Sequence, residues 1–267
     1  MSTLAYTVGD SATMLRRNLK HQLRYPSMTL MLVGMPIVFL LLFVYVFGGQ
    51  LGAGLNGGHG GRGTYLTYVV PGILIVTVAS AALGTAISVA MDMTGGIIDR
   101  FRTMAIARAA VLTGHVIGSL IQTLVGVAIV LGVALAVGFR PSAGPLAWLA
   151  AIGVLALFAF ALIWLSTALG LAAKSVETAS NTPMFLTLLP FLSSGFVPTR
   201  TMPAGLRQFA EYQPFTPVTE TVRGLLTGIA PGTGTIVAAL AWSAGVALAS
   251  YLWAIRLYHH RRPAEPK

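Results

Sequence analysis

The residues that could do chemistry in this sequence gather in one short stretch, 95–108, which lies between long apolar runs. Its apolar residues Ile97, Phe101 and Met104 follow one another at spacings of four and three, which places them on one face of a helix. Such a helix, with an apolar stripe and a charged face, suits docking against another protein. An ordinary loop whose arginines only fix membrane topology would carry the same charges, so spacing alone leaves both interpretations open. The ionised residues of the stretch are Asp99, Arg100, Arg102 and Arg108.

The other polar residues do not form the arrangements that catalysis needs. The segment from Gly170 to Ser175 resembles a phosphate-binding P-loop, but it lacks the glycine before Lys174 and follows an apolar run rather than a strand. The seven acidic residues form no close pair in an apolar run, and His59 has no second ligand nearby. With no nucleophile and base in sight, we expect no catalytic residue, no metal and no cofactor bound by this chain.

Charged residues are also missing from the middle of every apolar run. A carrier driven by protons or sodium ions uses such groups inside the membrane. The chain therefore needs an energy source outside itself, and the stretch 95–108 is where a partner would connect. His115 and Gln122 are polar but uncharged within an apolar run, and we expect them to hydrogen bond to a neighbouring helix.

The amino-acid composition indicates which kind of fold positions these residues. Of 267 residues, 55% are hydrophobic and only 9% are charged, with a mean hydropathy of +0.80. Soluble domains carry roughly 25% charged residues, so the solvent of this chain is a lipid bilayer. Cysteine is absent, which excludes disulfides. The fold class we predict is an all-α membrane protein forming a single transmembrane domain over 1–267.

Apolar runs long enough to cross the membrane predict six transmembrane helices, since about 20 residues span the hydrocarbon core. The fifth run is shorter than the rest. Ser80, Gly84 and Ser88 in the second run form a small-residue stripe suited to helix contact. A glycine-rich stretch, 48–63, predicts a flexible loop. The predicted spans are 28–47, 65–91, 110–137, 146–173, 182–194 and 235–257.

Two further segments are predicted to touch the membrane without crossing it. In 11–25, leucines recur every four residues with cations one position along, as in a helix that lies at the headgroups. In 195–227, prolines alternate with phenylalanines too apolar for a free loop, which favours a re-entrant segment on the extracytoplasmic side. Glu220 and Arg223 in this segment are three residues apart and able to pair on a helix.

The Lys and Arg residues set the predicted orientation in a cell membrane. With both termini cytosolic, 12 of the 17 Lys and Arg residues lie on the cytosolic side, close to the ends of the spans. The net charge of +10 therefore reflects topology, and we expect no nucleic-acid partner. This orientation places the loop 92–109 in the cytosol.

Several short motifs of this sequence resemble the daunorubicin-resistance branch of type-2 ABC transporter permeases. The similar motifs occur in order along nearly the whole chain, and the set is specific although each motif is weak. One departure is Ala105, where the family usually has proline, so the end of the loop helix is not fixed by the resemblance. The motifs are Arg24-Tyr25-Pro26, 42–49, Tyr68-Val69-Val70-Pro71-Gly72-Ile73, 96–102, Gly195-Phe196-Val197-Pro198, Met202-Pro203 and Pro214-Phe215-Thr216-Pro217.

The resemblance implies a six-helix permease subunit that dimerises with itself or a related permease and works with two ATPase subunits. ATP and Mg²⁺ would bind those partners, and hydrophobic drugs, antibiotics or lipids would be moved outward by alternating access. A coupling helix in the first cytosolic loop would dock on the ATPase through Gly96, Ile97, Asp99, Arg100, Phe101, Arg102 and Met104. A substrate path between the second and fifth helices would include Tyr68, Thr77, Phe185 and Leu189.

Three other functions compete with drug export. Exporters of polysaccharide or lipid-linked glycan share this topology. A membrane scaffold would need no transport path. An intramembrane enzyme is disfavoured because no catalytic constellation is present.

Overall fold

The computed structural model describes residues 26–55, 60–94, 108–173 and 175–260, and the described chain is helical with no strand. Five of its helical stretches are long and apolar enough to cross a membrane: Leu32–Leu55, Arg62–Met93, Thr113–Val137, Pro145–Ala172 and Thr233–Tyr258. The all-α class of a multi-pass membrane protein is therefore confirmed. The predicted interfacial helix, 11–25, lies outside the described residues.

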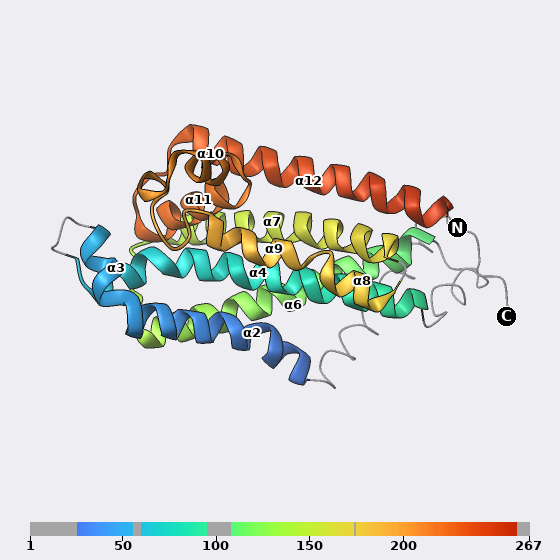
Figure 1. The fold of residues 1–267 in the computed structure, drawn as a ribbon, viewed down its shortest axis with the longest axis horizontal. Helices are drawn as coiled ribbons and strands as arrows, with labels where there is room; N and C mark the ends of the chain where they lie inside the picture. The colour runs from blue at the N-terminus through green and yellow to red at the C-terminus, as the bar shows by residue number, and fades with distance from the viewer. Residues whose placement is uncertain (1–25, 56–59, 95–107, 174, 261–267) are drawn as a thin grey trace.

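The long helices run side by side along the long axis of the molecule (Figure 1). The first is α2 (Pro26–Leu41), which continues through a π-helical turn, η1 (Leu42–Phe47), into α3 (Gly48–Leu55). Next come α4 (Arg62–Thr94) and α6 (Arg108–Val137). The bundle is completed by α7 (Pro145–Ala172) and α12 (Thr233–His260).

Between α7 and α12 the chain forms only short helical pieces. A broken stretch of α8 (Val176–Asn181), α9 (Met184–Leu188) and η2 (Leu189–Leu192) packs along α4. It leads to η3 (Thr199–Thr201), α10 (Ala204–Tyr212) and α11 (Phe215–Thr227). Figure 1 shows α3, α10 and α11 at the same end of the bundle, and the broken stretch returning the chain to that end.

The central element of the bundle is α4, which packs against α2, α6, α7, α8, α9 and α11. In its most apolar window 72% of the residues are buried, against 17% for α12. Small residues allow this packing, because a Cβ atom on Gly170 of α7 would lie 2.6 Å from the carbonyl oxygen of Ala86 in α4. The crossing of α4 and α7 therefore depends on glycine at position 170.

One local prediction was wrong. The glycine-rich residues 48–55 form α3 rather than a flexible loop, and Gly52 packs closely on Gly61 at the start of α4. Gly84 of the predicted small-residue stripe meets no other described helix, since a Cβ there would have nothing within 4 Å, so its part in helix contact stays a prediction. Ser88, one turn further along α4, is also exposed, so this part of the stripe faces away from the other described helices.

Candidate functional site

The predicted docking stretch lies outside the residues that the structure describes, so it stays a prediction. This applies to the following residues, in chain order: Gly96, Ile97, Asp99, Arg100, Phe101, Arg102, Met104 and Ala105.

The described helices on either side of this stretch, α4 and α6, are joined by a side-chain hydrogen bond. Nε2 of His115 lies 2.7 Å from Oδ2 of Asp92, and both side chains are mostly buried. The expectation that His115 hydrogen bonds to a neighbouring helix is confirmed. Gln122 in the same helix has no such bond among the described residues, so the expectation stays untested there. The Asp92–His115 contact ties the end of α4 to the beginning of α6.

At the opposite end of the bundle, α4 and α11 border a pocket of about 680 Å³, which we call the α4–α11 pocket. Its size falls within the range of small-molecule sites, roughly 300–1,000 Å³. Three of its lining residues are apolar: Leu55, Pro198 and Ile229. Five carry hydroxyl groups: Thr64, Thr67, Tyr68, Thr199 and Thr227. Three are charged: Arg200, Glu220 and Arg223.

Arg223 joins the two helices at the floor of this pocket. Its guanidinium donates to the carbonyl oxygen of Ser194 at 2.6 Å and to that of Tyr68 at 3.2 Å. The guanidinium carbon lies 3.9 Å from the centre of the Tyr68 ring, within range of a cation–π interaction. The hydroxyl of Tyr68 also donates to the Ser194 carbonyl, at 2.8 Å. Two donors from distant helices thus converge on one carbonyl group.

Side-chain donors from other parts of the chain also bind carbonyl groups elsewhere in the irregular backbone from 189 to 196. The Tyr65 hydroxyl donates to the Phe196 carbonyl at 3.1 Å, and the Gln213 amide donates to the carbonyls of Leu189 and Leu192. Side chains therefore satisfy carbonyl groups that a continuous helix would have paired internally.

Close backbone packing completes this junction. A Cβ on Gly72 of α4 would lie 2.5 Å from the carbonyl oxygen of Gly195. Only glycine permits such an approach, and it brings the Ser194 carbonyl within reach of both Tyr68 and Arg223.

The four predicted substrate-path residues do not meet at one place. Tyr68 lines the α4–α11 pocket, as described above. Thr77 is fully buried, and its hydroxyl donates to the Ile73 carbonyl within α4. Phe185 on α9 is 50% exposed, and Leu189 begins η2. Their part in a substrate path remains a prediction.

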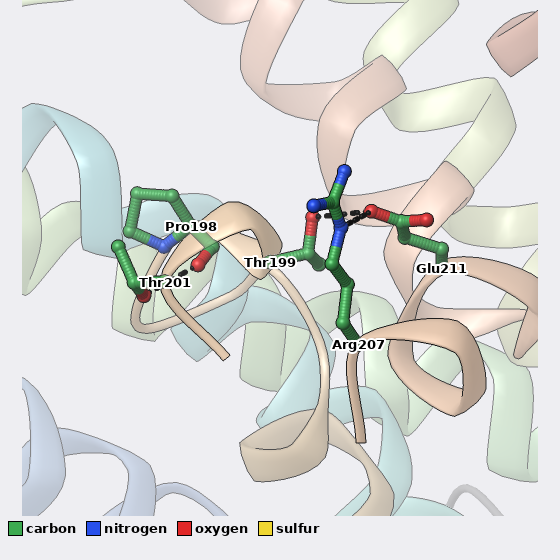
Figure 2. Close-up of polar contacts among 5 residues, drawn as sticks. All are labelled: Pro198, Thr199, Thr201, Arg207 and Glu211. Carbon is green, nitrogen blue, oxygen red and sulfur yellow. Dashed lines mark hydrogen bonds and ion pairs between the residues drawn. The ribbon is translucent and has the colours of Figure 1, made fainter. Parts of the chain in front are cut away.

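Beside the pocket, α10 carries its own polar cluster, shown in Figure 2. The Arg207 side chain donates to Glu211 at 2.8 Å, and the Thr199 hydroxyl donates to the same carboxylate oxygen at 3.3 Å. The hydrogen bond from Arg207 lowers the pKa of Glu211 below its ordinary value. The Thr201 hydroxyl donates to the carbonyl oxygen of Pro198 at 2.7 Å, within the turn that contains η3. These charges are satisfied among themselves.

Sequence reasoning missed most of the pocket. The resemblance singled out Tyr68, but the lining comes from α3, α4, η3, α11 and the turn after α11, which no local pattern connects. The predicted pairing of Glu220 with Arg223 is not among the ion pairs of the described residues, because the guanidinium is engaged by carbonyl groups instead.

Comparison with known proteins supplies the remaining context. A family model described as "ABC-2 type transporter" matches residues 11–227. The chain is 30% identical over 258 residues to the daunorubicin resistance ABC transporter permease protein DrrB1 of Streptomyces coeruleorubidus, covering 96% of this chain and 88% of that protein. It is 24% identical over 178 residues to "Probable doxorubicin resistance ABC transporter permease protein DrrC" of Mycobacterium tuberculosis, covering 67% of this chain and 64% of that protein.

Proposed function

The chain belongs to the ABC-2 type transporter family, and we propose that it is the membrane-spanning permease subunit of an ABC exporter for hydrophobic drugs. The observation that carries the proposal is the similarity to the daunorubicin resistance permease over 96% of the chain. Antibiotics and lipids fall within the same proposed substrate class. Five long apolar helices, with the buried α4 at their centre, give the chain the architecture that a multi-pass permease requires.

We propose a sixth crossing of the membrane by the broken stretch α8–α9–η2. Its course along α4 back toward α10 and α11 supports this, because side chains satisfy its irregular backbone as the bilayer demands. The distribution of Lys and Arg then places both termini in the cytosol of a cell with this protein in its plasma or inner membrane. In this orientation the α4–α11 pocket would face the extracytoplasmic side, lined in part by the proposed re-entrant region 195–227.

Energy would come from two copies of a separate ABC ATPase, which bind ATP and Mg²⁺. The cytosolic loop 92–109 would dock on the ATPase, with Ile97 and Phe101 as the apolar anchor and Arg100 and Arg102 setting the register by charge. The Asp92–His115 contact at the root of this loop would transmit movement to α4 and α6.

We propose that two permease chains, identical or closely related, form the transport path. The exposed small-residue face of α4 around Gly84 leaves a surface on which a second chain can approach closely. Substrate would pass apolar and aromatic groups, among them Tyr68, Thr77, Phe185 and Leu189, and leave by way of the α4–α11 pocket.

The test is to co-purify the chain with candidate ABC ATPases and measure drug-stimulated ATP hydrolysis of the complex in lipid vesicles. We expect the permease alone to hydrolyse no ATP and the complex to be stimulated by hydrophobic drugs. Stimulation by a lipid-linked glycan and not by drugs would favour glycan export. A stable complex with no substrate-dependent hydrolysis and no vesicle transport would indicate a scaffold.

A further inference from the structure

The three charged groups of the α4–α11 pocket differ in what they already bind. Arg223 donates to two carbonyl groups and covers the Tyr68 ring. The side chains of Arg200 and Glu220 make neither a hydrogen bond nor an ion pair with the described chain, although Glu220 lies within electrostatic range of Arg223. The pocket therefore presents one cation and one anion whose hydrogen-bonding capacity is unused.

The uncharged lining adds two further properties. Thr64, in the first turn of α4, contributes a hydroxyl with no partner in the described chain. Leu55, Pro198 and Ile229 supply an apolar side, and Ile229 is 72% exposed, so this side opens outward. A ligand that matches the pocket therefore combines a cation, an anion and an apolar body.

We propose that the α4–α11 pocket binds the headgroup of a zwitterionic phospholipid that carries a primary ammonium. The ammonium pairs with Glu220, while the phosphate pairs with Arg200 and accepts from Thr64. A guanidinium matches the geometry of phosphate oxygens, and an ammonium supplies the donors that a carboxylate accepts. A purely anionic lipid would leave Glu220 unpaired, and a purely cationic amphiphile would leave Arg200 unpaired.

The same headgroup chemistry exists free in solution as phosphoethanolamine. We assign the lipid because the pocket has an apolar side and is lined partly by α3 and α11, which lie at one end of the bundle (Figure 1). Lipid headgroups lie at the ends of membrane-spanning helices. The assignment does not rest on the transport substrate, so it can hold or fail independently of drug export.

The test measures lipid retention by the purified full-length chain with native mass spectrometry after delipidation. Phosphatidylethanolamine, phosphatidylglycerol and soluble phosphoethanolamine are each added back to the parent and to Glu220→Gln and Arg200→Gln. Matched controls are Glu211→Gln and Arg207→Gln, which alter the same residue types on α10 outside the pocket. Neither the Glu220 nor the Arg200 side chain makes a hydrogen bond or an ion pair with the described chain, so we expect both variants to fold, and size-exclusion profiles check this.

We expect the parent to bind phosphatidylethanolamine about tenfold more tightly than phosphatidylglycerol, since hydrogen bonds to charged groups have about that worth. Glu220→Gln should abolish the preference by weakening only phosphatidylethanolamine, and Arg200→Gln should weaken both lipids. Both controls should match the parent. Equal binding of the two lipids by the parent, or a preference that survives Glu220→Gln, would overturn the proposal. Binding of phosphoethanolamine without the lipid would overturn the lipid source.

Discussion

The junction at Arg223 makes a quantitative prediction about local stability. Arg223→Met keeps the length and apolar stem of the side chain but removes both hydrogen bonds and the cation–π contact with Tyr68. Hydrogen bonds from a charged donor contribute about 1.5–3 kcal/mol each, and a desolvated cation–π contact about 2 kcal/mol. The cost of burying the guanidinium, several kcal/mol, offsets part of this sum. We expect the free energy of opening the 189–196 segment to fall by about 3 kcal/mol.

The sequence contains no cysteine, so a single introduced thiol can report the opening of this segment without background labelling. Ser194 is 1% exposed and its hydroxyl has no hydrogen-bond partner, so Ser194→Cys introduces a buried thiol without breaking a side-chain contact. When labelling is slower than reclosing, the rate of reaction with a maleimide reports the opening equilibrium. A loss of 3 kcal/mol corresponds to labelling about 100-fold faster.

Two controls separate local opening from general damage. Arg207→Met removes an exposed pair worth about 0.3–0.5 kcal/mol and should raise labelling at position 194 by no more than about threefold. Ser166→Cys places a second buried thiol on α7, where the serine hydroxyl also lacks a partner, and should label at the parental rate in the Arg223→Met background. If Arg223→Met accelerates labelling at 194 no more than Arg207→Met does, the Arg223 contacts do not hold this segment.

Three further predictions concern coupling and transport. Phe101→Ala should weaken co-purification with the ATPase by about 2 kcal/mol, whereas Arg102→Ala should weaken it less and in a salt-dependent way; a silent Phe101→Ala would mean that the loop only sets topology. Asp92→Asn and His115→Asn should show a coupling energy of about 1 kcal/mol in a double-mutant cycle of thermal unfolding, and additive effects would show that their 2.7 Å contact contributes nothing. Phe185→Ala should alter the order of drug preference in vesicle transport at unchanged expression, because its side chain is half exposed on α9, and an unaltered order would remove it from the path.

The continuous spans could be predicted from hydropathy because each is a local property of the sequence. The helices α4, α6, α7 and α12 begin and end within about three residues of the predicted apolar runs. In these segments most backbone hydrogen bonds are made inside the helix, so neighbours along the chain largely determine the structure. The apolar run at 182–194 has the same composition but a different outcome. Pro183 and Pro190 interrupt it, and it becomes the short pieces α9 and η2.

The geometry of the broken stretch could not be predicted, because its stabilising partners are remote in the sequence. The Ser194 carbonyl is bonded by Tyr68, 126 residues earlier, and by Arg223, 29 residues later. The Phe196 carbonyl is bonded by Tyr65, 131 residues earlier. No periodicity or local motif encodes such pairings, and the pocket they shape was missed for the same reason.

Glu220 and Arg223 do not form the ion pair that their spacing on the helix predicts, because Arg223 has other partners. Residues of opposite charge three apart on a helix pair with a modest gain, about 0.2–0.5 kcal/mol, when both are exposed to water. Here the guanidinium of Arg223 is packed between helices and donates to the carbonyl groups of Tyr68 and Ser194, because a buried charged donor left without acceptors costs several kcal/mol. This cost exceeds the gain from a surface ion pair, so the Arg223 guanidinium donates to backbone carbonyl groups rather than to Glu220. Because Arg223 is engaged by carbonyl groups, the Glu220 carboxylate has no hydrogen-bond partner at the pocket wall. The negative charge that the proposed ammonium would bind is therefore left available by the same contacts that stabilise the broken stretch.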